Sequence, residues 1–179
     1  IRVIRDEGLY KHFSVSKPGD SNQSFEIILF PSHLVITGDM GTYCFSRARD
    51  MLQWFVKESG SAMASPEAEI GRWHKSLVSV DAQMGAKKKS LSMALGRISE
   101  NIEFYIAEYP DYKDTIESEF DDLVLCSEDG VDVLLNEMYN FKLLLPDEHH
   151  PFSDIDFRDV EAYVSQFAWC CYAINYTIG

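Results

Sequence analysis

The hydrophobic periodicity of this chain changes near residue 46, and that change restricts the fold class more than any other feature. Before it, turn residues separate short β-rich runs, which span 9–15, 24–30, 33–37 and 42–45. This arrangement is typical of consecutive antiparallel strands. After it, apolar residues recur every three or four positions, which is the period of an amphipathic helix. We therefore predict an α+β fold, in which an antiparallel meander of three to four strands packs against about five to six helices.

The change in periodicity also predicts how the chain is organised. Residues 1–46 are expected to be mainly β and residues 47–179 mainly α. A length of 179 residues fits one compact domain, so we expect 1–179 to form a single domain. The predicted helical segments are 47–58, a stretch from Pro66 to Met84, a stretch from Leu91 to Tyr105, and helices that start at Asp111, Val131 and about Asp156.

The cysteines and the apolar runs bear on the compartment. Cys44, Cys126, Cys170 and Cys171 lie in apolar segments and lack the regular spacing of a secreted disulfide scaffold. We interpret them as buried thiols in a reducing cytoplasm. The apolar runs are shorter than the roughly 18–20 residues that cross a bilayer. The sequence therefore predicts a cytoplasmic protein without a membrane partner.

The net charge of −13 is distributed unevenly. Residues 1–60 carry seven basic and seven acidic side chains, and residues 61–99 carry six and three. Residues 100–179 carry three basic and nineteen acidic side chains, a net charge of −16. Such a block disfavours direct contact with nucleic acid phosphates and favours a protein with a basic surface. Lys87, Lys88 and Lys89 form a small basic cluster, which we interpret as a solvated junction between helices.

The predicted helix that starts at Asp111 carries much of this acidity. If Ile116 and Phe120 point inward, a turn of about 100° per residue sends several carboxylates outward together. Such a face could occupy the basic groove of a nucleic-acid-binding protein. The alternative is a solvated face that only keeps the protein soluble. The predicted partner-binding residues are Asp111, Asp114, Glu117, Asp121, Asp122, Glu128 and Asp129.

A second candidate site lies at residues 147–156, where histidines and acids crowd together. The candidate metal ligands are His149, His150 and Asp154, because imidazole and carboxylate groups bind zinc and harder divalent ions. Adjacent histidines rarely aim at one ion, and no known metal motif is present. A solvated loop that caps the following helix is the alternative. We assign no metal and no cofactor.

A cysteine nucleophile would need a histidine base beside it. Cys44 with His12 or His33, on adjacent predicted strands, is the candidate, and a buried thiol is the alternative. The turn at 38–41 contains two glycines that could expose backbone amides to a ligand, but no phosphate-binding motif follows it. We interpret this turn as a tight strand connection and predict no catalytic residue.

Short segments at both ends of the chain include Arg5-Asp6-Glu7-Gly8-Leu9-Tyr10, Gly38-Asp39-Met40-Gly41-Thr42-Tyr43 and Trp169-Cys170-Cys171-Tyr172. These segments resemble a family of uncharacterised tailed-phage and prophage proteins. The similarity covers roughly the first 58 and the last 28 residues, and the middle helices match no motif. It implies a setting, an accessory protein in a bacterial cytoplasm, but no activity.

Charge and resemblance together predict a non-enzymatic phage protein. It would bind and inhibit a host nucleic-acid-processing or defence complex, of the anti-CRISPR or anti-restriction type, through the carboxylates of residues 100–132. Two alternatives stay open: a small metal-dependent or cysteine enzyme, and a homo-oligomeric scaffold or virion-associated protein. A homodimer is also left open.

Overall fold

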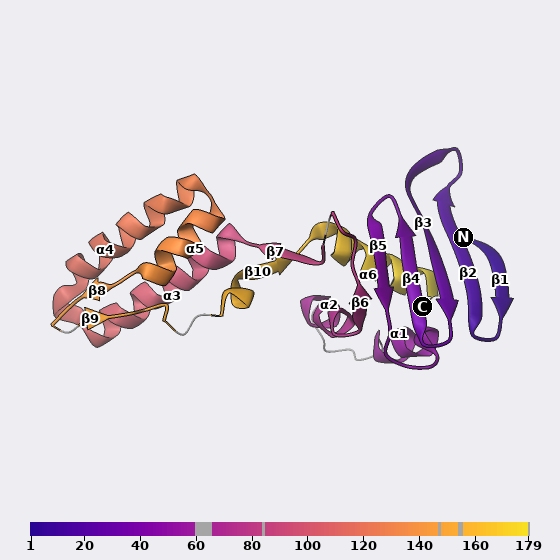
Figure 1. The fold of residues 1–179 in the computed structure, drawn as a ribbon, viewed down its shortest axis with the longest axis horizontal. Helices are drawn as coiled ribbons and strands as arrows, with labels where there is room; N and C mark the ends of the chain where they lie inside the picture. The colour runs from indigo at the N-terminus through magenta and orange to yellow at the C-terminus, as the bar shows by residue number, and fades with distance from the viewer. Residues whose placement is uncertain (60–65, 84, 147, 154–155, 179) are drawn as a thin grey trace. The chain divides into compact units, whose positions relative to one another are not determined.

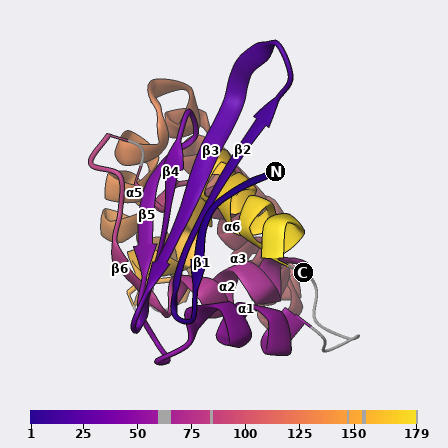
Figure 2. The same cartoon turned by 90° about the vertical axis from the view of Figure 1, so that its right-hand side faces the viewer.

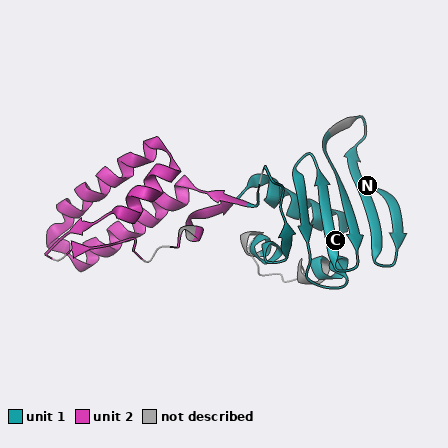
Figure 3. Ribbon diagram, in the orientation of Figure 1, with its two compact units in different colours: residues 1–86, 163–179 teal, residues 87–162 magenta. Residues whose placement is uncertain are grey.

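A computed structural model describes residues 1–59, 66–83, 85–146, 148–153 and 156–178. The chain forms two compact units (Figure 3). Unit 1 comprises residues 1–86 and 163–179, and unit 2 comprises residues 87–162, so unit 2 is inserted into the chain of unit 1. The secondary structure is α+β, as predicted. The prediction of a single domain concerns cooperative folding, and it stays a prediction.

Unit 1 is built on one antiparallel sheet, seen in Figure 1. Each strand pairs with its neighbours in numerical order. The prediction of three to four strands was too low, because the charges of Arg2–Glu7 hide its strand character and the apolar spacing of Leu77–Ser79 fits a helix. The six strands are β1 Arg2–Glu7, β2 Tyr10–Lys17, β3 Asp20–Phe30, β4 His33–Gly38, β5 Gly41–Phe45 and β6 Leu77–Ser79.

Alternation along the strands gives this sheet one buried face. Ile27 pairs with Ile36, and Ile36 pairs with Tyr43, so that these side chains form a buried row across three strands. The helices α1 (Met51–Ser59), α2 (Pro66–His74) and α6 (Ser165–Ile178) lie on one side of the sheet (Figure 2). The core that they close contains Phe45, Phe55, Trp73, Phe167, Cys171 and Ile174.

Two predicted helix boundaries in unit 1 were wrong. The helix predicted from Pro66 towards Met84 ends at His74, because Leu77 leaves the helix to pair with Phe45. The last helix begins at Ser165 and not near Asp156, because the residues before it form the 3-10 helix η3 (Phe157–Val160) and the strand β10 (Glu161–Tyr163). In both places a tertiary pairing overrides local periodicity.

Unit 2 is mainly helical. Besides η3, its helices are α3 (Leu91–Glu108), η1 (Pro110–Tyr112), α4 (Lys113–Leu125), η2 (Cys126–Asp129) and α5 (Val131–Asn140). The Ser90 hydroxyl caps α3 by accepting a hydrogen bond from the Met93 N–H at 3.4 Å. Two short strands, β8 (Leu143–Leu144) and β9 (Glu148–His149), pair with each other. The core of this unit contains Ile98, Ile116, Phe120, Leu134, Met138 and Phe152.

The sequence predicts a junction between helices at the lysine cluster, and this prediction is wrong. Lys87–Lys89 form the strand β7, which pairs with β10. Within the described part of the chain, no helix is both long enough and apolar enough to cross a membrane.

Candidate functional site

The seven predicted partner-binding residues all lie in unit 2 and are all exposed. Four of them lie on α4, whose opposite face is buried through Ile116, Phe120 and Leu123. Because these three apolar residues fix the inward direction, the carboxylates three and four positions apart share the outward face. Asp111 lies on η1, Asp114, Glu117, Asp121 and Asp122 on α4, and Glu128 and Asp129 on η2.

Local rules explain the start of α4 but not its end. Pro110 and Asp111 lie in the first turn of η1, and Asp114 lies in the first turn of α4. The positive end of the helix dipole stabilises carboxylates at such positions. Asp121 and Asp122 lie near the C-terminal end, where carboxylates are unfavourable, and the last turn has no basic residue. These two acids therefore stabilise neither end of the helix.

Four acidic residues elsewhere in unit 2 have basic partners. Ion pairs join Glu100 to Arg97 at 2.8 Å, Asp132 to Lys89 at 2.5 Å, Glu148 to Lys142 at 3.0 Å and Asp156 to Arg158 at 2.6 Å. The hydrogen bond and charge of Lys142 lower the pKa of Glu148, and the hydrogen bonds of Arg158 lower the pKa of Asp156. Away from α4, these negative charges are compensated locally.

The predicted set on η1, α4 and η2 differs in this respect. Glu117 lies 3.7 Å from Lys113, which is a weak exposed pair. Among the described residues, no basic side chain forms an ion pair with the other six. We call these seven residues the α4 acidic face. Its negative charge is left open to solvent or to a partner.

A groove runs between α4 and α5. It has a volume of about 340 Å³ and a floor that includes Leu123 and Phe141. The carboxylates of Glu119, Asp122 and Glu137 line it. Sequence reasoning had found only Asp122 of these three, because Glu119 is the residue beside the inward Phe120 and Glu137 belongs to a different helix. Only the packing of α5 on α4 brings them together.

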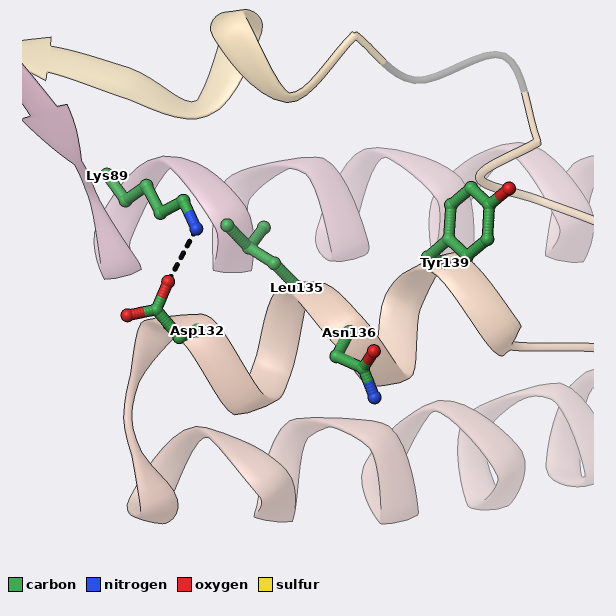
Figure 4. Close-up of a pocket in the computed structure, with 5 residues that line it drawn as sticks. All are labelled: Lys89, Asp132, Leu135, Asn136 and Tyr139. Atoms are coloured by element: carbon green, nitrogen blue, oxygen red, sulfur yellow. Dashed lines mark hydrogen bonds and ion pairs between the residues drawn. The ribbon is translucent and has the colours of Figure 1, made fainter.

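A larger hollow, of about 460 Å³, lies on another face of α5 (Figure 4). Lys89 and Asp132 point towards each other at one end, and Tyr139 stands at the other, with Asn136 between them. Tyr139 is 64% exposed, whereas Leu135 is buried. The charges in this hollow compensate each other, which distinguishes it from the α4 acidic face.

Among the described residues, the candidate metal ligands do not converge on one point. The His150 Nε2 lies 3.0 Å from a Glu148 carboxylate oxygen. The His149 ring instead packs edge-on against Tyr105 and Tyr109, and its buried Nε2 has no hydrogen-bond partner among the described residues. Asp154 lies outside the described residues. Among the described residues, no three histidine, cysteine, aspartate or glutamate side chains form a group that could hold a metal ion.

The cysteine candidate is corrected in part. Cys44 on β5 and His12 on β2 are not on adjacent strands, since β3 and β4 lie between them; strands about 4.8 Å apart put them roughly 14 Å apart. His33 is on the adjacent strand, but its ring stacks on Phe30 and its Nδ1 lies 3.2 Å from the Pro31 carbonyl oxygen.

Burial also works against a reactive thiol. It raises the pKa of Cys44, raises that of Cys170 to about 12, and raises that of Cys171 as well. A thiol whose pKa is raised is protonated at neutral pH and is a poor nucleophile. Cys170 and Cys171 are buried, as the sequence predicts, whereas Cys44 and Cys126 are only half-buried.

The turn at 38–41 is the tight connection between β4 and β5 that the sequence predicts. The Asp39 carboxylate accepts a hydrogen bond from the Ser24 N–H at 3.1 Å. A Cβ on Gly38 would lie 2.2 Å from the Ser24 carbonyl oxygen, so this position requires glycine. The turn therefore joins β4 to β5, and Asp39 links it to β3.

A scan of protein-family models, a search of curated proteins and a search of solved structures each found no significant match to this chain. The similarity to tailed-phage and prophage proteins thus stays a prediction. The functional argument depends on the charges and the packing of the chain itself.

Proposed function

We propose that unit 2 is a docking module for a basic protein surface, and that the protein is a phage-encoded inhibitor of a host nucleic-acid-processing or defence complex. The observation that carries this proposal is the α4 acidic face, whose carboxylates are exposed and mostly without basic partners. The phage setting is supported by the sequence resemblance alone.

The geometry of α4 suits this role. The carboxylates of Asp114, Glu117 and Asp121 recur every three to four residues, which is about 4.5–6 Å along a helix. A row of negative charges a few ångströms apart is also what a nucleic acid backbone presents to its binding proteins. A groove that binds phosphates would therefore attract this face, and long-range attraction would speed the encounter.

The placement of the acids also favours binding over stability. Asp121 and Asp122 lie at the helix end where a carboxylate is unfavourable. A protein that needed negative charge only for solubility could carry it at helix N-termini or beside basic residues, as it does at Glu100 and Asp132. Uncompensated charge at an unfavourable position is expected where a partner supplies the compensation.

The test compares two variants that change the net charge equally. The first replaces Asp111, Asp114, Asp121 and Asp122 with Asn. The second replaces four ion-paired residues of unit 2, through Glu100→Gln, Asp132→Asn, Glu148→Gln and Asp156→Asn. Tagged forms are used to capture proteins from bacterial lysate at low and high salt, and any captured nuclease is assayed for inhibition by the purified protein.

We expect the wild type and the second variant to capture and inhibit the same nuclease complex, and high salt to release it. The first variant should lose capture, with a weaker dependence on salt. Equal capture by both variants, or a captured complex that stays fully active, would contradict the proposal.

A further inference from the structure

The strand β1 forms one edge of the sheet in unit 1. It pairs with β2 on one side, and no strand among the described residues pairs with its other side. All six of its residues are exposed. An edge strand presents a row of unpaired N–H and C=O groups, which is a template for pairing with another strand.

The order of residues along β1 restricts which strand could pair there. Arg2 lies near one end, Val3 and Ile4 lie in the middle and are 56% and 44% exposed, and Asp6 and Glu7 lie at the other end. An antiparallel copy of the same strand would bring Arg2 opposite the acidic end and Ile4 close to its own equivalent. A parallel copy would oppose like charges, which is unfavourable.

We propose that β1 pairs antiparallel with β1 of a second copy of this chain, about a two-fold axis near Ile4, so that the two sheets become continuous. Two-fold symmetry uses each complementary contact twice, which is the usual arrangement of a homodimer. This inference concerns unit 1 and is independent of the function proposed for unit 2.

The ion pairs already present on β1 do not prevent this contact. Glu7 pairs with Arg5 at 2.6 Å, and Asp6 pairs with Lys11, but each carboxylate can accept further hydrogen bonds. Arg2, in contrast, has no ion pair among the described residues. The complementary contact across the axis would therefore give Arg2 its partner.

The edge is also protected against indiscriminate pairing. A β-bulge interrupts the ladder between Val3 and Arg5, and charged residues occupy both ends of the strand. Bulges and edge charges are the devices by which proteins prevent unrelated strands from adding to a sheet. A second copy satisfies the charge order, whereas an apolar strand does not.

Because six residues bury little area, we expect a dimer that depends on concentration and not a permanent one. Sedimentation velocity of the full chain over a range up to about 1 mM should show the mass rising from monomer to dimer. Arg2→Glu should weaken the dimer on the order of tenfold, since two symmetric attractive pairs become repulsive. Lys17→Glu, on the exposed end of β2, makes the same charge change and should leave the dimer unaffected.

A mixing experiment separates this contact from any effect on folding. At a concentration where the wild type is half dimeric, the variant with both Asp6→Lys and Glu7→Lys should be mainly monomeric alone, as should Arg2→Glu. Mixed together, they should form a heterodimer, because the acidic residue at position 2 of one chain then faces the lysines of the other. If the lysine variant does not fold, the comparison of Arg2→Glu with Lys17→Glu decides the question.

The proposal would be overturned by a wild type that stays monomeric across the range. It would equally be overturned by a dimer that Arg2→Glu and Lys17→Glu leave equally strong, since another surface would then hold the copies together.

Discussion

The two units of this protein differ little in how they bury apolar residues but sharply in how they manage charge. Unit 1 carries nine basic and ten acidic side chains, a net charge of −1, whereas unit 2 carries seven and nineteen, a net charge of −12. In unit 1, Asp6, Glu7 and Glu26 each lie beside a basic residue. In unit 2, among the described residues, Glu100, Asp132, Glu148 and Asp156 form ion pairs, whereas only Glu117 of the α4 acidic face does so. The proposed role of α4 in recognition depends on this difference.

The largest expected effect tests whether each unit depends on its own core. Phe167 is fully buried in unit 1 against Tyr43 and Phe45, and Phe120 is fully buried in unit 2 against Phe141 and Phe152. Replacing either with Ala should lower the free energy of unfolding by about 3–5 kcal/mol. Hydrogen exchange should show faster exchange mainly in the unit that carries the change.

If Phe167→Ala and Phe120→Ala gave the same hydrogen-exchange profile, the two units would not depend on separate cores. If Phe120→Ala opened unit 1 as much as unit 2, the chain would unfold as one cooperative domain, and the single-domain prediction from the sequence would hold.

Replacing one glycine in each unit with alanine should change stability in opposite directions. Gly38 has no room for a Cβ, so Gly38→Ala should destabilise unit 1 by about 1–3 kcal/mol. Gly96 lies exposed within α3, with no atom within 4 Å of an added Cβ, so Gly96→Ala should stabilise unit 2 by about 0.5–1 kcal/mol. Thermal unfolding of both variants measures this, and a loss of stability on Gly96→Ala would contradict it.

The sequence predicted the fold where local pattern and tertiary structure agree. The alternation of Phe25, Ile27 and Leu29 and the break at Pro110 both correspond to the structure. It failed at β1, whose residues are all exposed, and at β6, whose three residues join the sheet through pairing with β5. Exposed strands lack a buried face, and short strands depend on distant partners, so neither leaves a periodic signal.

Only part of the candidate site could be predicted from the sequence. The outward direction of Asp114 and Asp121 follows from the inward direction of Ile116 and Phe120, which the sequence alone supplies. Which acids have basic partners does not follow, because the pair between Lys89 and Asp132 spans 43 positions of the chain. The groove that Glu119 and Glu137 share also depends on how α5 packs on α4.

Alkaline pH should affect unit 1 through Tyr43. Burial raises the pKa of Tyr43 to about 12, and its hydroxyl donates a hydrogen bond to the Gly85 carbonyl at 2.9 Å. Because the folded state keeps this proton, stability is complete below the unfolded pKa near 10 and falls as the pH rises from about 10 towards 12. Tyr43→Phe should cost about 1 kcal/mol at neutral pH and reduce that alkaline loss.

Urea unfolding at several values between pH 8 and 11 would measure this effect. The variant should still lose some stability at alkaline pH. Cys170 and Cys171 also have raised pKa values in the folded state, so their ionisation favours unfolding as the pH rises. A Tyr43→Phe variant with the same slope as the wild type above pH 10 would show that Tyr43 is not the titrating group.

The smallest expected effect concerns the end of α4. Asp121→Asn removes a carboxylate from the unfavourable end of the helix dipole, so it should stabilise unit 2 by about 0.3–0.5 kcal/mol. The matched change Asp114→Asn, in the first turn, should destabilise it by a similar amount. Equal effects of the two changes in thermal unfolding at low salt would contradict the account of α4.

The most direct test of the central claim is an NMR titration of the labelled full chain with a short arginine-rich peptide. If the uncompensated carboxylates of α4 bind basic surfaces, chemical shifts should change along 111–129 and the changes should weaken with salt. The paired acids Glu100, Glu148 and Asp156 should change little. Shifts spread equally over paired and unpaired acids of unit 2 would contradict the claim that α4 is a distinct docking face.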